Sequence, residues 1–107
     1  MNIYYAPTAQ EYIEDLSGIG YEKHYFSYKE SSQNYVRLLI RDMEATLHLK
    51  HKRKAPAYFS RYGKDLWCVS CPRSKQTTWY FFFTRHAGDI YVIRSITNHH
   101  AEGQFLK

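Results

Sequence analysis

The last third of the chain constrains its fold most strongly, because it has the pattern of a β-hairpin. Two runs rich in aromatic and β-branched residues, Trp79–Thr84 and Ile90–Thr97, are separated by the short segment Arg85–Asp89. Strand-prone runs joined by a short turn that contains Gly and Asp are typical of a hairpin. The second run is followed by His99 and His100, so the sequence places two imidazoles where the last strand ends.

The length and composition of the chain indicate one folded domain over residues 1–107. Apolar residues make up 44% of the chain, which argues against a disordered protein. Eleven Tyr and six Phe residues favour a core with wet edges, or a surface on which flat ligands stack.

The charge balance favours polyanionic partners over acidic proteins or neutral metabolites. Lys and Arg outnumber Asp and Glu by 15 to 10, which gives a net charge of +5, and the sequence pI is about 9.2. Neither a membrane-spanning apolar run nor a charged-then-apolar leader is recognisable, so we expect a soluble, cytoplasmic protein without membrane contact.

Cys68 and Cys71 form a C-x-x-C pattern that we interpret as two reduced thiols. A structural zinc site usually takes four ligands, and the sequence contains no second Cys pair. Both cysteines lie in a strand-like run, where positions three apart point to opposite faces. We therefore expect no metal site and no cofactor here.

The first half of the chain predicts a short strand over Asn2–Ala6 and then two helices. Pro7 opens the first helix, Thr8 and Glu11 have capping-box spacing, and Ser17–Gly20 is expected to end it.

Residues 21–30 are ambiguous, and a stronger helix is expected from Ser31 or Ser32 to about Leu49. Its apolar positions follow helical spacing: Tyr35, Leu38, Leu39, Met43, Thr46 and Leu47. The basic block Lys50–Lys54 follows, and either caps this helix or binds a polyanion.

The remainder predicts strands, over Ala57–Tyr62, Leu66–Cys71 and the two arms of the hairpin. The predicted fold is α+β: a short N-terminal strand, two helices, then a three- to four-stranded antiparallel sheet. We expect the helices on one side of the sheet and the working surface on the other.

This order of elements resembles the RelE/ParE superfamily of bacterial toxins, mainly over residues 57–106. The resemblance is carried by a glycine-preceded strand (Gly63–Val69), a basic turn (Arg73–Lys75), the aromatic strand and the final strand. Members similar to RelE and YoeB carry a catalytic His or Arg, followed closely by Tyr, just after the last strand, where Asn98–His100 stands here. The resemblance implies a toxin that cleaves mRNA without a metal, alone or on the ribosome, and a cognate antitoxin as its partner.

Departures from the family pattern leave other functions open. RelE-type ribonucleases carry lysines on the outward face of the strand that contains Cys68 and Ser70 here, and an Arg where Thr77 and Thr78 stand. The resemblance therefore also allows a ParE-like, non-catalytic inhibitor of DNA gyrase, or a non-toxic RNA- or protein-binding module.

RNA cleavage through the ribose 2′-OH needs a base, an acid and cations for the phosphate. Histidine serves both proton-transfer roles near neutral pH, so His99 and His100 are the candidate pair. Neighbouring residues on a strand face opposite ways, so both serve only if the chain has left the sheet by Asn98.

Arginine suits the phosphate because its planar fork pairs with two oxygens. Arg94 stands within an apolar strand, so we expect it on the open sheet face or paired with Asp89 or Glu102. The candidate RNA-binding residues, five cations and one stacking ring, are Arg61, Lys64, Arg73, Lys75, Arg85 and Tyr80.

Overall fold

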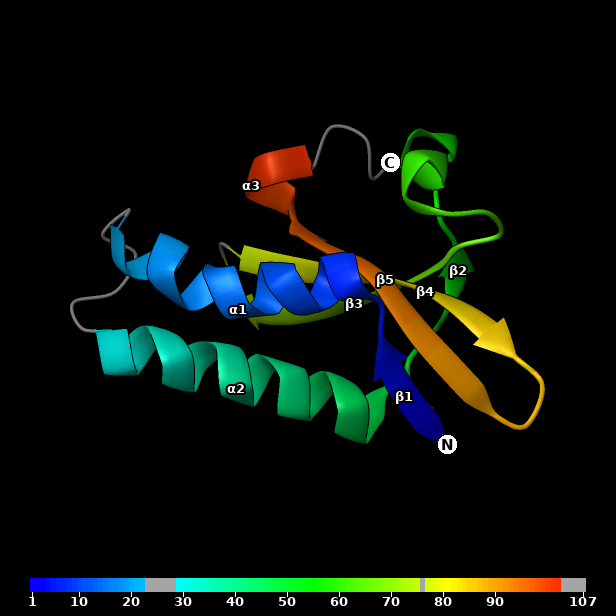
Figure 1. Cartoon of the computed structure of the whole chain (residues 1–107), viewed down its shortest axis with the longest axis horizontal. Helices are drawn as coiled ribbons and strands as arrows, with labels where there is room; N and C mark the ends of the chain where they lie inside the picture. Colours follow the sequence, from blue (N-terminus) through cyan, green and yellow to red (C-terminus); the bar gives the residue numbers. More distant parts are fainter. Residues whose placement is uncertain (23–28, 76, 103–107) are drawn as a thin grey trace.

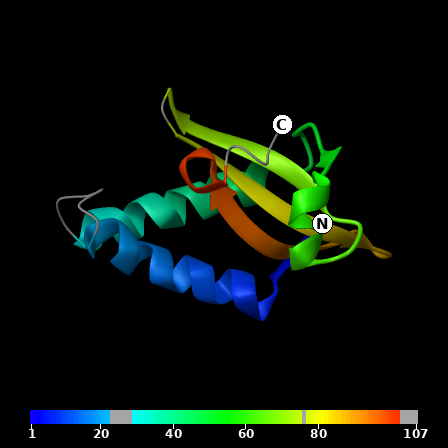
Figure 2. The same cartoon turned by 90° about the horizontal axis from the view of Figure 1, so that it is seen from above.

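The computed structural model describes residues 1–22, 29–75 and 77–102, which form an α+β fold (Figure 1). In chain order the elements are β1 (Asn2–Tyr5), α1 (Pro7–Glu22), α2 (Lys29–Thr46), β2 (Arg53–Lys54), the 3-10 helix η1 (Ala57–Tyr62), β3 (Trp67–Ser74), β4 (Thr77–His86), β5 (Ile90–Asn98) and α3 (His99–Glu102). Figures 1 and 2 show α1 and α2 side by side on one face of the sheet.

The sheet has five strands in the order β1-β5-β4-β3-β2. The meander from β2 to β5 is antiparallel, whereas β1 pairs in parallel with β5. The predicted sheet of three to four antiparallel strands was therefore too small, because β1 joins one edge and the two-residue β2 joins the other. The α+β class and the helices on one face agree with the prediction.

The β4–β5 hairpin is confirmed. Gly88 and Asp89 adopt positive φ angles of 81° and 60° in the turn, a backbone region that glycine and, less readily, aspartate tolerate. The pairing slips by one residue between Phe82 and Phe83, where β5 has Ser95 and Ile93 opposite them. This bulge changes which side chains of β5 face each side of the sheet.

The aromatic strand β4 alternates between the two faces of the sheet. Phe81 and Phe83 are fully buried against α1 and α2, together with Leu39 and Met43. Phe82 points to the other face, where Phe59 of η1 stacks on it with ring centroids 4.4 Å apart. The strand therefore contributes to two cores, one on each side.

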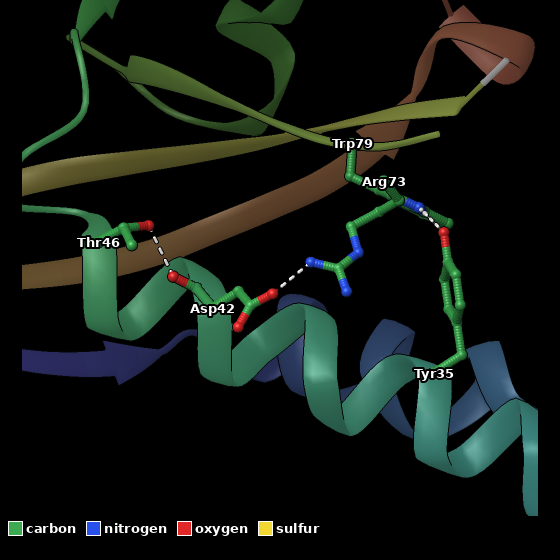
Figure 3. A network of polar contacts seen from close by, with 5 residues as sticks. All are labelled: Tyr35, Asp42, Thr46, Arg73 and Trp79. Atoms are coloured by element: carbon green, nitrogen blue, oxygen red, sulfur yellow. Dashed lines mark hydrogen bonds and ion pairs between the residues drawn. The ribbon is translucent and has the colours of Figure 1, made fainter. Parts of the chain in front are cut away.

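Polar contacts also join α2 to the sheet (Figure 3). The indole Nε1 of Trp79 donates a hydrogen bond to the Tyr35 hydroxyl over 2.9 Å. Arg73 of β3 forms an ion pair with Asp42, and this guanidinium lowers the pKa of the Asp42 carboxyl. Both contacts lie on the helix-covered side.

The ends of the two helices differ from the predicted ones. Thr8 is not a cap, because α1 already begins at Pro7 and the carbonyl of Ala6 accepts the Gln10 N–H at 2.9 Å. Proline fits a first helical position, which needs no N–H. The helix continues through the expected stop at residues 17–20 to Glu22. Of the ambiguous residues 21–30, residues 23–28 lie outside the described part of the chain.

The second helix begins at Lys29 and ends at Thr46, three residues before the expected Leu49. The carbonyl of Thr46 accepts backbone N–H groups from Leu49 and Lys50, so a turn replaces the last expected helical turn. The basic block therefore begins beyond the helix.

The predicted strand over Ala57–Tyr62 is wrong, since this segment is the 3-10 helix η1. In a 3-10 helix, side chains three positions apart lie on one side. Phe59 and Tyr62 have this spacing and contact each other with ring centroids 6.2 Å apart. The aromatic content that suggested a strand instead packs one side of η1 onto the sheet.

Candidate nucleic-acid interface

The sheet face opposite α1 and α2 is only partly covered by η1, and beside η1 it contains a pocket of about 570 Å³. We call this cavity the open-face pocket. It is lined by Lys50, His51, Arg53, Cys68, Ser70, Pro72, Thr78 and Tyr80. Its volume lies within the range of roughly 300–1,000 Å³ that is common for small-ligand sites.

The floor of the pocket follows from strand alternation and register. Cys68, Ser70 and Pro72 are alternate residues of β3, so they share one face. Ser70 is paired with Tyr80 and Pro72 with Thr78 across the β3–β4 ladder. Ser70 is exposed and Tyr80 is half-buried, so a hydroxyl and an aromatic ring both border the cavity.

One wall of the pocket is basic. Arg53 of β2 pairs with Cys68 of β3, which holds the block that follows α2 alongside the floor. Lys50 and His51 line the cavity with Arg53, and among the residues that the structure describes no Asp or Glu lines it. This side of the pocket therefore carries basic side chains.

The two cysteines lie on opposite sides of the sheet, as predicted. Cys68 belongs to the core beneath η1 and Cys71 to the core beneath the helices, and both are buried and free. Burial raises the pKa of Cys68 to about 11, although Arg53 acts in the opposite direction. The thiol that lines the pocket is therefore protonated at neutral pH and is a poor nucleophile.

His99 lies at the start of α3 and is fixed to β4. The backbone N–H of Thr78 donates a hydrogen bond to Nδ1 of His99 over 3.1 Å. A neutral ring that accepts at Nδ1 carries its proton on Nε2. Because Thr78 also lines the open-face pocket, this bond connects His99 directly to the pocket wall.

The chain leaves the sheet where the proposed acid/base pair requires it to. The last strand ends at Asn98, whose side-chain Oδ1 accepts the N–H of Ala101 at 2.9 Å and caps α3. The rings of His99 and His100 consequently lie side by side, with centroids 4.0 Å apart and planes tilted by 38°. Nε2 of His100 lies 3.3 Å from Oγ1 of Thr77.

Arg94 lies on the sheet face opposite the helices. This agrees with the first predicted alternative, the open face, rather than with a carboxylate partner. Its Nε donates a hydrogen bond to Oγ1 of Thr84 over 3.2 Å. Asp89, one alternative partner, instead pairs with the N-terminal ammonium of Met1 at 3.1 Å. The side chain of Glu102 lies outside the described part of the structure. Arg94 does not line the open-face pocket.

The structure does not gather the predicted RNA-binding cations around this pocket. Arg73 and Arg85 lie on the helix-covered side, Arg73 against Asp42 and Arg85 5.6 Å from the ring centroid of Tyr91. This corrects the expected ring of cations. Arg85 faces the helices because odd-numbered positions of β4 do so, and Arg73 lies at the bulge of β3 between Pro72 and Ser74, from which it reaches Asp42.

The other predicted cations lie at the margins. Arg61 sits over the ring of Tyr58, 3.9 Å from its centroid, while Lys64 and Lys75 are exposed in the connections before and after β3. Among the six predicted RNA-binding residues, Tyr80 alone lines the pocket.

Sequence reasoning missed the residues that form the basic wall, Lys50, His51 and Arg53. The signal was present as the basic block, for which helix capping and polyanion binding were left as alternatives. The strand β2 could not be predicted from the sequence, because two residues are too few to show a strand pattern.

Within the described residues, no group of three or more His, Cys, Asp or Glu side chains is placed to hold a metal ion. In the same part of the chain, no helix is long and apolar enough to cross a membrane.

Comparisons with known proteins gave no match to any family model, curated protein or solved structure. The kinship with the RelE/ParE superfamily therefore stays a prediction.

Proposed function

We propose that this protein binds single-stranded RNA on the open face of its sheet and cleaves it, as a toxin of the RelE/ParE type. The single observation that supports this most strongly is the open-face pocket, which Lys50 and Arg53 line together with Tyr80. Cations bind the phosphate backbone and aromatic rings stack exposed bases, which is how many proteins hold single strands.

The cleavage step is proposed to follow the chemistry of the 2′-hydroxyl. One imidazole takes the 2′-OH proton while the 2′-oxygen attacks phosphorus and forms a 2′,3′-cyclic phosphate. The other imidazole donates a proton to the departing 5′-oxygen, so charge and protons balance. His99 and His100 are the candidate pair, because their rings lie together and His99 is bonded to the pocket residue Thr78.

Arg94 was expected to stabilise the phosphate in this reaction, but it donates to Thr84, six residues along β4 from Thr78. At about 3.3 Å per residue that is roughly 20 Å of strand, so Arg94 is proposed to contact a more distant part of the RNA on the same face and not the phosphate between the histidines. A cognate antitoxin that covers the open face would block RNA access. Cleavage on the ribosome and cleavage of free mRNA both fit this proposal, and both would take place in the cytoplasm.

One observation favours a second candidate, a non-catalytic inhibitor of the ParE type. Each imidazole has one nitrogen at hydrogen-bonding distance from the start of β4, as a packing role would require. In that case the open face would bind a protein such as DNA gyrase, and the histidines would only fix α3 to the sheet.

Two measurements distinguish the two candidates: the RNA cleavage products and the growth of cells that express the protein. Purified protein is incubated with single-stranded RNA, and separately with translating ribosomes, for wild type, His99→Ala, His100→Ala and the control His48→Ala. His48 is exposed beyond the end of α2 and does not line the pocket. A lost proton-transfer group is expected to lower the cleavage rate by roughly 10²–10⁴-fold, whereas the control should cleave like wild type.

Fold is checked in every variant by circular dichroism. Equal cleavage by wild type and the folded His99→Ala and His100→Ala variants would refute the acid/base assignment. In a separate experiment the variant that carries both His99→Ala and His100→Ala is expressed in bacteria. Growth arrest by this double variant, without RNA breaks, would replace the ribonuclease proposal with the inhibitor.

A further inference from the structure

We infer that the open-face pocket is a binding site for one nucleotide unit, with the phosphate on the basic wall and the base against Tyr80. This rests on the proposed function and specifies it, because it assigns recognition to residues that the family resemblance does not supply. It also gives the proposed RNA binding a source of positive charge other than β3, which carries Cys68 and Ser70 in place of lysines.

Two cations on one side of the pocket form the phosphate half of the site. Lys50 and Arg53 reach the same cavity from two successive segments, the turn after α2 and the edge strand β2. A guanidinium and an ammonium together suit a phosphate, since one pairs with two oxygens and the other acts as a compact charge. The hydroxyl of Ser70, exposed on the floor, adds a further donor.

The backbone that carries the two cations is held in place at both residues. The register Arg53↔Cys68 fixes β2 to the floor strand, and the Lys52 ammonium donates to the carbonyl of Lys50 at 3.2 Å. Cys68 beneath them is protonated and therefore does not oppose an anion. An incoming phosphate would meet a wall whose backbone is already positioned.

The ring of Tyr80 forms the base half of the site. This ring packs against the Phe59–Phe82 core on one side and lines the pocket on the other. It is thus held firmly while part of it stays accessible, which favours stacking of a flat ligand. The neighbouring Thr78 hydroxyl offers a polar group for the edge of a base.

The size of the cavity favours a single nucleotide over a duplex. A pocket of about 570 Å³ suits a ligand of small-molecule size rather than a length of duplex. In a duplex, bases are stacked inside and cannot reach an aromatic ring on a protein surface. The inferred ligand is therefore a splayed-out nucleotide of a single strand, or a free mononucleotide with the same chemistry.

The test compares neighbouring positions that differ only in whether they line the pocket. Arg53→Gln and Lys54→Gln each remove one positive charge from the two-residue strand β2, and only Arg53 lines the cavity. His51→Gln and His48→Gln form a second pair outside the sheet, which keeps the test valid if β2 is disturbed. AMP, inorganic phosphate and a short single-stranded RNA are titrated into each folded variant.

Wild type is expected to bind AMP more tightly than inorganic phosphate, because only AMP uses Tyr80. Arg53→Gln should weaken AMP binding about tenfold or more, the order expected for a charge-assisted contact, and Lys54→Gln less than about twofold. His51→Gln should weaken it more than His48→Gln. Tyr80→Leu should weaken AMP binding and leave phosphate binding unchanged. RNA binding that follows the same order identifies a strand as the natural ligand, and AMP binding alone identifies a free mononucleotide.

Equal losses in the matched variants, or AMP bound no more tightly than phosphate, would overturn the nucleotide site. The outcome is separate from that of the proposed function. Cleavage of RNA together with no AMP response would refute this site and leave the ribonuclease in place. AMP binding that follows the predicted order of variants, without RNA cleavage, would refute the ribonuclease proposal and leave the nucleotide site in place.

Discussion

The backbone N–H of Thr78 and Nδ1 of His99 are joined by a hydrogen bond of 3.1 Å, which fastens α3 to the start of β4. Replacing His99 with Ala removes the acceptor and leaves a partly buried donor without its partner. We expect a loss of about 1 kcal/mol in the free energy of unfolding and faster hydrogen exchange at the Thr78 amide. The His48→Ala variant should leave that amide unchanged, and unaltered exchange in His99→Ala would contradict the bond.

The contact between Trp79 and Tyr35 predicts a small and specific loss of stability. Tyr35→Phe keeps the ring but removes the oxygen that accepts from the buried indole. The expected cost is about 1 kcal/mol in the free energy of unfolding, measured by urea denaturation. Tyr4→Phe, at a ring that is 57% exposed, should stay within about 0.5 kcal/mol of wild type. Equal effects at the two positions would show that the indole bond adds nothing.

The stacking of Phe59 on Phe82 predicts that η1 contributes strongly to the stability of the core between η1 and the sheet. Both rings are fully buried, so Phe59→Ala should cost about 3–5 kcal/mol. The neighbouring Ser60→Ala, at an exposed position of the same helix, serves as the control and should be nearly neutral. A loss below about 1 kcal/mol for Phe59→Ala would mean that η1 is not packed on the sheet as described.

The ion pair between Arg73 and Asp42 predicts an acid-sensitive contribution to stability. The Arg73 guanidinium lowers the Asp42 pKa below its ordinary value of 3.8, so the unfolded chain binds this proton more readily. The contribution is complete above the ordinary pKa and is lost as pH falls through the lowered value. Asp42→Asn should therefore melt at a lower temperature than wild type near neutral pH, and the difference should shrink in strong acid. A difference that stays constant with pH would contradict the ion pair.

Local sequence patterns predicted the elements whose interactions are local or strongly periodic. The hairpin was clear because the turn before Ile90 and the aromatic run at Trp79–Phe83 both favour it. The second helix was clear because Leu39, Met43 and Leu47 repeat at helical spacing and are buried. The α+β class followed from the order of these elements.

Elements that depend on tertiary contacts were less visible. Ala57–Tyr62 has β-prone residues, but packing of Phe59 on Phe82 determines its 3-10 conformation. The parallel pairing of β1 with β5 joins Asn2 to Ile90, residues at opposite ends of the chain. No local pattern encodes such a partner.

The candidate site was predicted in part. Tyr80 and the pair His99–His100 were identified from their positions on or after strands. The basic wall was not, because Arg53 reaches the pocket only through its pairing with Cys68. Arg73 has a suitable charge, yet it lies at the bulge of β3 and pairs with Asp42 on the other face.

The most direct test of the account asks which face of the sheet RNA contacts. A short single-stranded RNA is titrated into ¹⁵N-labelled protein, and backbone amide shifts are followed at low and moderate salt. We predict that shifts centre on Ser70, Thr78 and Tyr80, and that they weaken as salt rises because phosphate contacts release counterions. Shifts confined to the outer surfaces of α1 and α2, or no shifts at all, would contradict it.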